Sequence, residues 1–408
     1  MSTLTIGIIV VFVLGYAFIA MESLTKINKA AIALLMFVFC WVLYMVDPAP
    51  FVQLMHPDFK GTGEQVLSFV NSLITEHLGD TATTLFFLMG AMTIVEIVDQ
   101  NGGFNWVKNV MHSKTKRSLL WKIAFMTFFL SAILDNLTTS IVMIMILRKL
   151  VHDKKDRMIY ASLVIIAANS GGAFSPIGDV TTIMLWNAGM ITAGGVISEI
   201  FIPSLLSMII PALLLQTALK GNIEYDDMGT DLMGDTVVLE FTGLQRKVIF
   251  AIGVGGLCFV PLFHYLTELP PFVGILLVLG ILWTVTELFY RHMHRRRGDN
   301  IQFSKRVSNL LSRIDMSTIL FFLGILMAVA CLEEVGVLHE LGGGLNSFFE
   351  GNHYAVTGII GVLSSIVDNV PLVAGSMGMY PIQATGDMAV DGIFWQLLAY
   401  CAGVGGSI

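Results

Sequence analysis

Long apolar blocks separated by short polar segments dominate the sequence. The first two, residues 4–21 and 30–46, are nearly free of charge. Each is close to the roughly 20 residues that a helix needs to cross about 30 Å of hydrocarbon. Nine further blocks lie at 81–98, 119–147, 158–187, 199–219, 248–263, 272–290, 316–332, 354–380 and 393–408. This pattern predicts an all-α integral membrane protein, and because no basic segment precedes the first block, we expect that block to be retained as a helix.

Composition agrees with the hydropathy pattern. The chain is 55% hydrophobic and 13% charged, with a mean hydropathy of +0.78, whereas a soluble domain has about 25% charged residues. The four cysteines are scattered through apolar blocks without metal-ligand spacing, so we expect them to be packing residues. The net charge of −7 lies in the connecting segments. We expect no nucleic-acid partner and no cofactor.

The positions of Lys and Arg predict two helical hairpins. Cytoplasmic loops hold an excess of these residues, and residues 119–147 have basic segments at both ends. One crossing cannot place both ends in the cytoplasm, so we predict a re-entrant hairpin with its turn at 134–140. Residues 354–382 have no basic flank and are interrupted at Asp368, which predicts a hairpin open to the outside. One long tilted helix, the alternative for each segment, does not fit this charge distribution.

Two halves of the sequence repeat one another. The segment 130–136 shares five of seven residues with 363–369 at an offset of 233. Two further matches occur at nearly the same offset, between 85–88 and 320–323 and between 168–172 and 402–406. Because the predicted hairpins open to opposite sides, we predict inverted repeats, each with a hairpin and a discontinuous transmembrane helix.

This interpretation divides the chain into three parts. Residues 1–220 form the first repeat, 221–245 an acidic connecting loop, and 246–408 the second repeat. The counterpart of residues 175–219 is missing after the second repeat, so we expect the chain to be truncated at its C-terminus.

The discontinuous helix of the first repeat is predicted from its helix breakers. Gly171, Gly172, Pro176 and Gly178 lie within one apolar block, and these residue types favour a break. Inside a membrane, freed backbone groups persist only where they line a cavity or are buried in protein, and unwound carbonyls bind Na⁺. We therefore predict an ion site beside Asp179, with a packed proline kink as the alternative.

Three carboxylates lie inside apolar blocks, at Asp135, Asp179 and Asp368. Acids inside a membrane span are costly and rare, so each is a functional candidate. Na⁺ binds only the ionised carboxylate and H⁺ binds the same oxygens, so the two ions compete for one site. Neutral oxygens from Asn136 and Asn369 would suit a hard monovalent cation.

These motifs resemble the NhaD family of Na⁺/H⁺ antiporters, which belongs to the ion transporter superfamily together with arsenite and di- or tricarboxylate carriers. The resemblance extends over essentially the whole chain. It rests on Asp-Asn-Leu-Thr-Thr-Ser at 135–140, on Ser-Gly-Gly-Ala-Phe-Ser-Pro-Ile-Gly-Asp-Val-Thr-Thr at 170–182, and on the second Asp-Asn at 368–369. It implies a scaffold and a transport domain, a homodimer in the lipid bilayer, and exchange of Na⁺ or Li⁺ for H⁺ across a bacterial inner membrane, with a role in pH homeostasis.

The residues and the resemblance together give an expected site. The cation and the proton are expected at Asp135, Asn136, Thr138, Asp179, Thr181, Asp368 and Asn369, with Na⁺ itself at Asp135, Asn136, Asp368 and Asn369. Supporting residues are Ser131, Asn169, Ser170, Gly171, Gly172, Ser364, Gly405 and Gly406.

Two alternatives use other chemistry. An organic-anion carrier on the same scaffold would have neutral hairpin tips, whereas an Asp at each tip repels a carboxylate substrate. An intramembrane aspartyl protease would carry Gly-x-Gly-Asp, but residues 176–179 read Pro-Ile-Gly-Asp. We therefore expect a transporter and not an enzyme.

Overall fold

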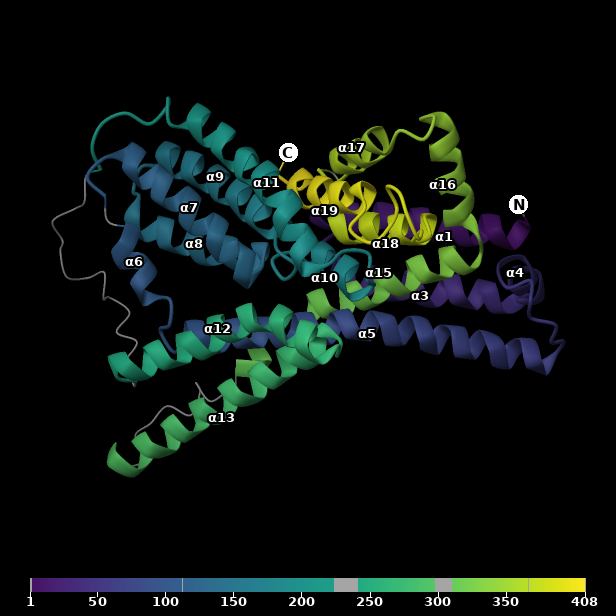
Figure 1. The fold of residues 1–408 in the computed structure, drawn as a ribbon, viewed down its shortest axis with the longest axis horizontal. Coiled ribbons are helices and arrows are strands. Elements are labelled where there is room, and N and C mark those ends of the chain that lie inside the picture. Colours follow the sequence, from purple (N-terminus) through teal and green to yellow (C-terminus); the bar gives the residue numbers. More distant parts are fainter. Residues whose placement is uncertain (1, 112, 224–240, 298–309, 366, 408) are drawn as a thin grey trace.

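The computed structural model describes residues 2–111, 113–223, 241–297, 310–365 and 367–407. Within these ranges the protein is built from helices (Figure 1), which confirms the predicted all-α membrane protein. Eight of the described helices are long and apolar enough to cross a membrane: α1 (Thr3–Ala20), α3 (Lys29–Val46), α5 (Glu64–Gln100), α7 (Lys116–Leu134), α11 (Ala193–Leu215), α12 (Gly243–Thr267), α13 (Pro271–Arg297) and α15 (Met316–Glu334).

The other α-helices are shorter or more polar. They are α2 (Glu22–Thr25), α4 (Ala49–Met55), α6 (Asn105–Met111), α8 (Asn136–Leu150), α9 (Lys154–Ala173), α10 (Val180–Asn187), α16 (Val337–Phe348), α17 (His353–Leu363), α18 (Asn369–Met379) and α19 (Ile393–Gly405). Most of the predicted acidic connecting loop falls on residues 224–240, which lie outside the described residues, as do residues 298–309.

Helix α5 begins well before the apolar block that predicted it. We expected a span at 81–98, but the helix starts at Glu64 and has 37 residues. At 1.5 Å per residue it is about 55 Å long, which exceeds the hydrocarbon thickness. In its polar first half, His77 Nε2 lies 2.8 Å from Glu334 Oε1 at the end of α15. This tertiary contact holds a polar stretch as helix, which hydropathy alone does not detect.

Helices α7 and α8 form the first predicted hairpin, with its turn at Asp135. Lys116 at the start of α7 pairs with Asp156 near the start of α9 at 2.5 Å. At the other end of α7, Ser131 Oγ donates a hydrogen bond to the Ala168 carbonyl of α9 at 2.6 Å. Helices α7 and α9 therefore run in the same direction, and α8, which joins them, runs back. The hairpin enters and leaves at one end of the bundle.

Helices α17 and α18 form the second hairpin in the same way. The His353 ring lies 5.6 Å from the Phe394 ring at the start of α19. At the other end of α17, Ser364 Oγ donates to the Ala402 carbonyl at 2.7 Å, so α17 and α19 run in the same direction and α18 runs back. This hydrogen bond repeats the one made by Ser131, at a position that the sequence repeat makes equivalent.

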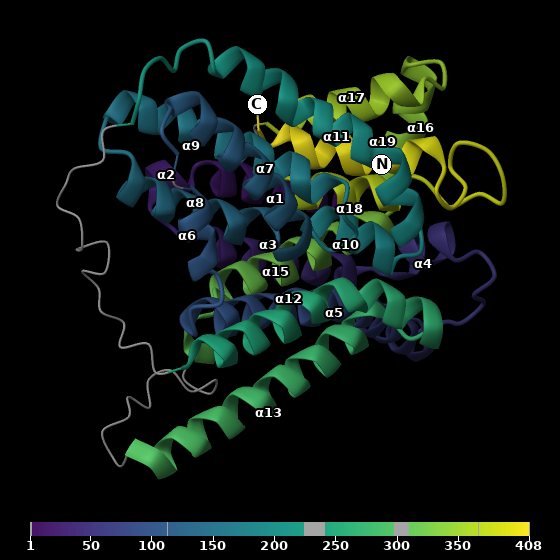
Figure 2. The same cartoon turned by 60° about the vertical axis from the view of Figure 1, so that its left-hand side comes forward.

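The two hairpins approach one another from opposite ends of the molecule. In Figure 1, α7 to α9 lie on the left and α17 to α19 on the right, and the ends of α9 and α19 meet near the C-terminus. There, Asn169 Nδ2 donates to Ser407 Oγ at 3.0 Å. Helices α3, α5 and α15 lie along the other side of this junction, with α12 and α13 packed against α5 (Figure 2). Both hairpin tips therefore lie in the middle of the molecule.

The first discontinuous helix has the predicted break, but only at the later two of its four predicted helix breakers, Pro176 and Gly178. Helix α9 continues through Gly171 and Gly172 to Ala173. The chain is irregular from Phe174 to Asp179, and it resumes as helix in α10. The expectation that the two glycines unwind the helix is therefore wrong, because the breaking residues are those around Pro176.

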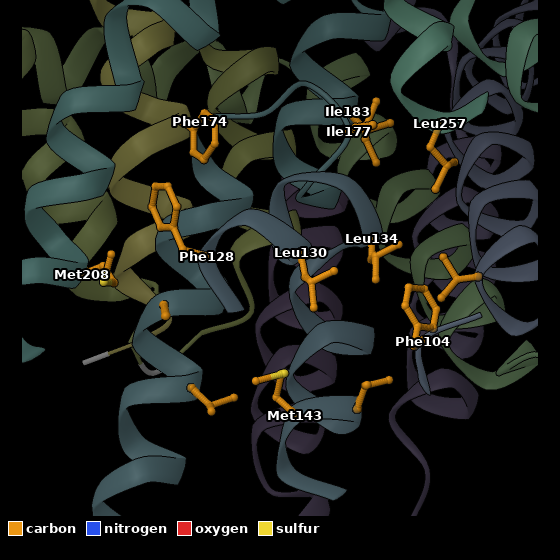
Figure 3. Packing of buried hydrophobic residues seen from close by; sticks show 14 of the residues in the cluster. Phe104, Phe128, Leu130, Leu134, Met143, Phe174, Ile177, Ile183, Met208 and Leu257 are labelled. Atoms are coloured by element: carbon orange, nitrogen blue, oxygen red, sulfur yellow. The ribbon is translucent and has the colours of Figure 1, made fainter. Parts of the chain in front are cut away.

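Gly171 serves close packing instead. A Cβ atom at this position would overlap the carbonyl oxygen of Phe128 on α7. The equivalent residue of the second half, Gly405, lies equally close to the carbonyl oxygen of Gly361 on α17. Around the first of these contacts, the rings of Phe128 and Phe174 stack with centroids 5.0 Å apart (Figure 3). In both halves, a glycine lets the helix that follows the hairpin, α9 or α19, lie directly against the hairpin's first helix.

Candidate functional site

The three predicted carboxylates line a single cavity between the hairpin tips and helices α3, α5 and α15. Its volume is about 310 Å³. Its walls are formed by Lys29, Leu88, Met92, Asp135, Asn136, Leu137, Thr138, Asn169, Asp179, Val180, Thr318, Phe322, Ser364, Asp368, Asn369, Val370, Gly403 and Gly406.

Each of the three carboxylates caps the N-terminus of a helix. Asp135 accepts a hydrogen bond from an amide of α8, Asp179 from one of α10 and Asp368 from one of α18. Asp is among the preferred residues at this position. A helix N-terminus carries about half a positive charge and attracts anions. At this cavity, the three N-termini are already occupied by the protein's own carboxylates.

Asp179 joins the two hairpin tips. Its Oδ2 accepts a hydrogen bond from Asn136 Nδ2 at 3.0 Å, and Asn369 Nδ2 lies 3.4 Å from both of its oxygens. Its Oδ1 also accepts from the amide and the hydroxyl of Thr181, both at 3.0 Å. The side chain is almost fully buried. One carboxylate of the broken helix therefore holds an amide from each half of the molecule.

Asp135 forms the turn of the first hairpin. Its φ of 82° is rare for a residue other than glycine. Its Oδ1 accepts from the Thr138 amide at 2.8 Å and its Oδ2 from the Thr138 hydroxyl at 2.7 Å. A carboxylate has about four lone-pair positions, so hydrogen bonds from Thr138 fix the orientation of the group and leave it able to bind an ion.

Asp368 differs because it pairs with a cation. Its Oδ2 lies 3.4 Å from Lys29 Nζ, at the start of α3. The same ammonium group lies 4.2 Å from the centroid of the Phe321 ring on α15. Lys29 was not among the expected site residues, because its place in the sequence indicates only a basic cytoplasmic loop.

Several expected residues lie behind the cavity wall. The Ser170 hydroxyl is buried and has no hydrogen-bond partner among the described residues. Thr181 and Ser131 make the hydrogen bonds given above. Gly171 and Gly405 pack against the hairpins, and Gly172 packs against Gly178 in the break. The structure therefore does not bring Ser131, Ser170, Gly171, Gly172, Thr181 and Gly405 to the cavity surface.

Sequence reasoning also missed the wall opposite the hairpin tips. Leu88 and Met92 come from α5, and Thr318 and Phe322 from α15. Leu88 and Phe322 lie in the repeated segments 85–88 and 320–323, but these residues are mostly apolar and lie in apolar helices, so the repeat does not show that they face the cavity rather than lipid. Their place at the cavity follows only from the packing of α5 and α15.

Known proteins resemble this chain over nearly its whole length. A family model described as citrate transporter (CitMHS) matches residues 16–405. Sodium/proton antiporter 1 of Arabidopsis thaliana is 40% identical over 403 residues, which cover 99% of this chain and 65% of that protein. This chain thus spans less than two thirds of the length of that relative.

Two other relatives are covered more fully. Sodium/proton antiporter 2 of the same plant is 38% identical over 398 residues, covering 97% of this chain and 87% of that protein. The Na⁺/H⁺ antiporter NhaD of Alkalimonas amylolytica is 27% identical over 424 residues, covering 98% of this chain and 80% of that protein.

Proposed function

We propose that this chain, which belongs to the citrate transporter family (CitMHS), is a secondary transporter that exchanges Na⁺ for H⁺ across its membrane. The predicted resemblance to the NhaD antiporters is confirmed by the relatives of that name. The observation that carries the proposal is the convergence of Asp135, Asp179 and Asp368 on one cavity at the tips of two hairpins. The members of the family and the relatives described above are transporters rather than enzymes.

In this proposal Asp135 is the carboxylate that Na⁺ and H⁺ share. When Na⁺ binds, the protonated carboxyl group releases its proton, and the resulting carboxylate coordinates the ion. When the ion leaves, a proton returns to the same oxygen. Thr138 keeps the group oriented toward the cavity through both of its hydrogen bonds. Asp179, which already accepts hydrogen bonds from Thr181 and Asn136, has the different role of holding the two tips together.

The family description favours a second candidate, a carrier of citrate or a similar organic anion. Three helix N-termini at one cavity would suit an anion. Each of them, however, carries an Asp, so a polycarboxylate would meet three carboxylates. Among the described wall residues, Lys29 is the one that carries a positive charge. The charge of the cavity therefore supports a cation as the substrate.

Reconstituted protein with a pH dye trapped in the vesicles tests the function. We expect Na⁺ to drive proton movement, and Li⁺ to do so as well, whereas K⁺ and citrate should not. At pH values where the shared carboxyl group of Asp135 is protonated, the apparent Na⁺ affinity should weaken about tenfold for each unit by which the pH falls. One proton must leave for each Na⁺ bound. Citrate-driven transport without any response to Na⁺ would establish the anion carrier instead.

We further propose that residues 1–220 and 246–408 are inverted repeats. The equivalent hydrogen bonds of Ser131 and Ser364 support this proposal. Cysteines introduced at Lys114 and Lys154, just before and just after the first hairpin, should be labelled only from the cytoplasm. A cysteine at Ala384, beyond the second hairpin, should be labelled only from outside. Labelling of all three from one side would contradict the inversion.

Exchange of Li⁺, assembly as a homodimer and a place in a bacterial inner membrane stay predictions. The relatives described above come from a plant and from a bacterium. The Li⁺ arm of the vesicle experiment tests the first of these predictions directly.

A further inference from the structure

Lys29 brings a positive charge into a cavity that is otherwise acidic. Its Nζ lies 3.4 Å from Asp368 Oδ2, and both residues line the cavity that also contains Asp135 and Asp179. The Lys29 side chain is 33% exposed and that of Asp368 is 27% exposed. The ion pair is therefore open to the cavity rather than sealed in the protein, and a small ion can reach it.

The position of Lys29 is not explained by its helix. It is the first residue of α3, capped by Asn28, where the helix dipole disfavours a positive charge. Lys26, three residues earlier, is exposed and supplies a basic residue to the same loop. Lys29 is instead stabilised by the Asp368 carboxylate and by the face of the Phe321 ring.

We propose that Lys29 is a specificity-determining residue of the ion site. Its ammonium group is a tethered cation that occupies Asp368 in the empty site and that an incoming Na⁺ must displace. This inference rests on the proposed Na⁺/H⁺ exchange. The flexible four-carbon stem of a lysine lets its charged end move aside without a change in the backbone.

The same charge sets the valence of the ion that the cavity accepts. While it stays near the site, a positive charge repels a divalent cation twice as strongly as a monovalent one at the same distance. Without Lys29, Asp368 would be an unpaired carboxylate, and the cavity would attract a divalent cation more strongly. With Lys29 present, one carboxylate is already paired, and the cavity favours a single monovalent ion.

Lys29→Gln tests the inference in the chain reconstituted into vesicles, with Lys26→Gln as the matched control. We expect Lys29→Gln to lower the half-saturating Na⁺ concentration by about tenfold, because a competing charge a few ångströms away is removed. We also expect millimolar Ca²⁺ or Mg²⁺ to inhibit this variant and to leave the parent and Lys26→Gln unaffected. Lys29→Arg, which keeps the charge, should behave like the parent.

The outcomes separate the inference from the proposed function. If the parent shows no Na⁺-driven proton movement, the proposed function fails. If the parent exchanges ions and Lys29→Gln has unchanged or weaker Na⁺ affinity with no inhibition by divalent cations, Lys29 is only a structural contact and the inference is overturned. Lys29→Met is a second neutral variant, and it replaces the glutamine variant in the same measurements if that variant does not insert. An equal gain in affinity in Lys29→Arg would also overturn the inference.

Discussion

Replacing Asp135 with Asn is expected to abolish Na⁺-dependent proton exchange while leaving the protein folded in its membrane. Asn caps a helix as well as Asp does, so its side-chain oxygen can still accept the hydrogen bond from the Thr138 amide that begins α8. Asn also tolerates the positive φ of this turn better than most residues. The substitution therefore removes the charge and the exchangeable proton but keeps the hairpin. Dye-based transport in vesicles measures the loss, and gel filtration in detergent checks the fold.

Asp153→Asn is the matched control for this experiment. Asp153 caps α9 by accepting a hydrogen bond from the Asp156 amide, as Asp135 caps α8, but it is exposed and lies in the loop after the hairpin. That hydrogen bond holds the pKa of Asp153 below its usual range, so the residue is ionised at neutral pH. The control variant should retain exchange. Robust exchange by Asp135→Asn would contradict the shared-carboxylate mechanism.

The hairpins and the three carboxylates were predictable because each involves single residues whose placement in a membrane has a large free-energy cost. An acid in hydrocarbon and a basic residue on the wrong side of a membrane are both expensive, so Asp135 and Asp368 stand out in the sequence. The internal repeat then relates the two positions. These signals come from single residues and their near neighbours, which is the information that a sequence contains directly.

The features that sequence reasoning missed depend on contacts between distant segments. The pairing of Lys29 with Asp368 joins residues 339 positions apart. The close approach of Gly171 to Phe128 depends on the packing of α7 on α9. A glycine that permits such packing and a glycine that breaks a helix have the same sequence signature, and only the backbone arrangement distinguishes them.

The division of roles among the carboxylates was also beyond the sequence. Asp135 and Asp179 are both acids in apolar blocks and were given the same expected role. The structure distinguishes them by their partners, because Asp179 receives amides from both hairpin tips whereas Asp135 is held by its own helix start. This difference leads to opposite expectations for the same chemical substitution.

Asp179→Asn is expected to destabilise the protein as well as to stop transport. Both carboxylate oxygens of Asp179 accept hydrogen bonds, Oδ2 from Asn136 and Oδ1 from Thr181. Asn369 Nδ2 lies 3.4 Å from both oxygens. An Asn side chain replaces one of these acceptors with an NH₂ group, so a buried donor then faces another donor. A buried polar group left without a partner costs about 1–3 kcal/mol, and hydrogen bonds to a charged acceptor are the stronger ones. Thermal unfolding in detergent should therefore show a lower midpoint for this variant than for the parent.

Comparison with Asp135→Asn makes the result decisive, since both variants replace a cavity carboxylate with an amide of the same shape. If Asp179 holds the two tips together, its variant should lose thermal stability and transport together, while Asp135→Asn loses transport at nearly the parent's stability. If Asp179 is instead the carboxylate that Na⁺ and H⁺ share, exchange should be lost in Asp179→Asn and should survive in Asp135→Asn. That pair of outcomes would assign ion binding to Asp179 in the broken helix instead of to Asp135 in the hairpin turn. It would leave Asp135 as the cap of α8, held by Thr138, with no part in ion binding.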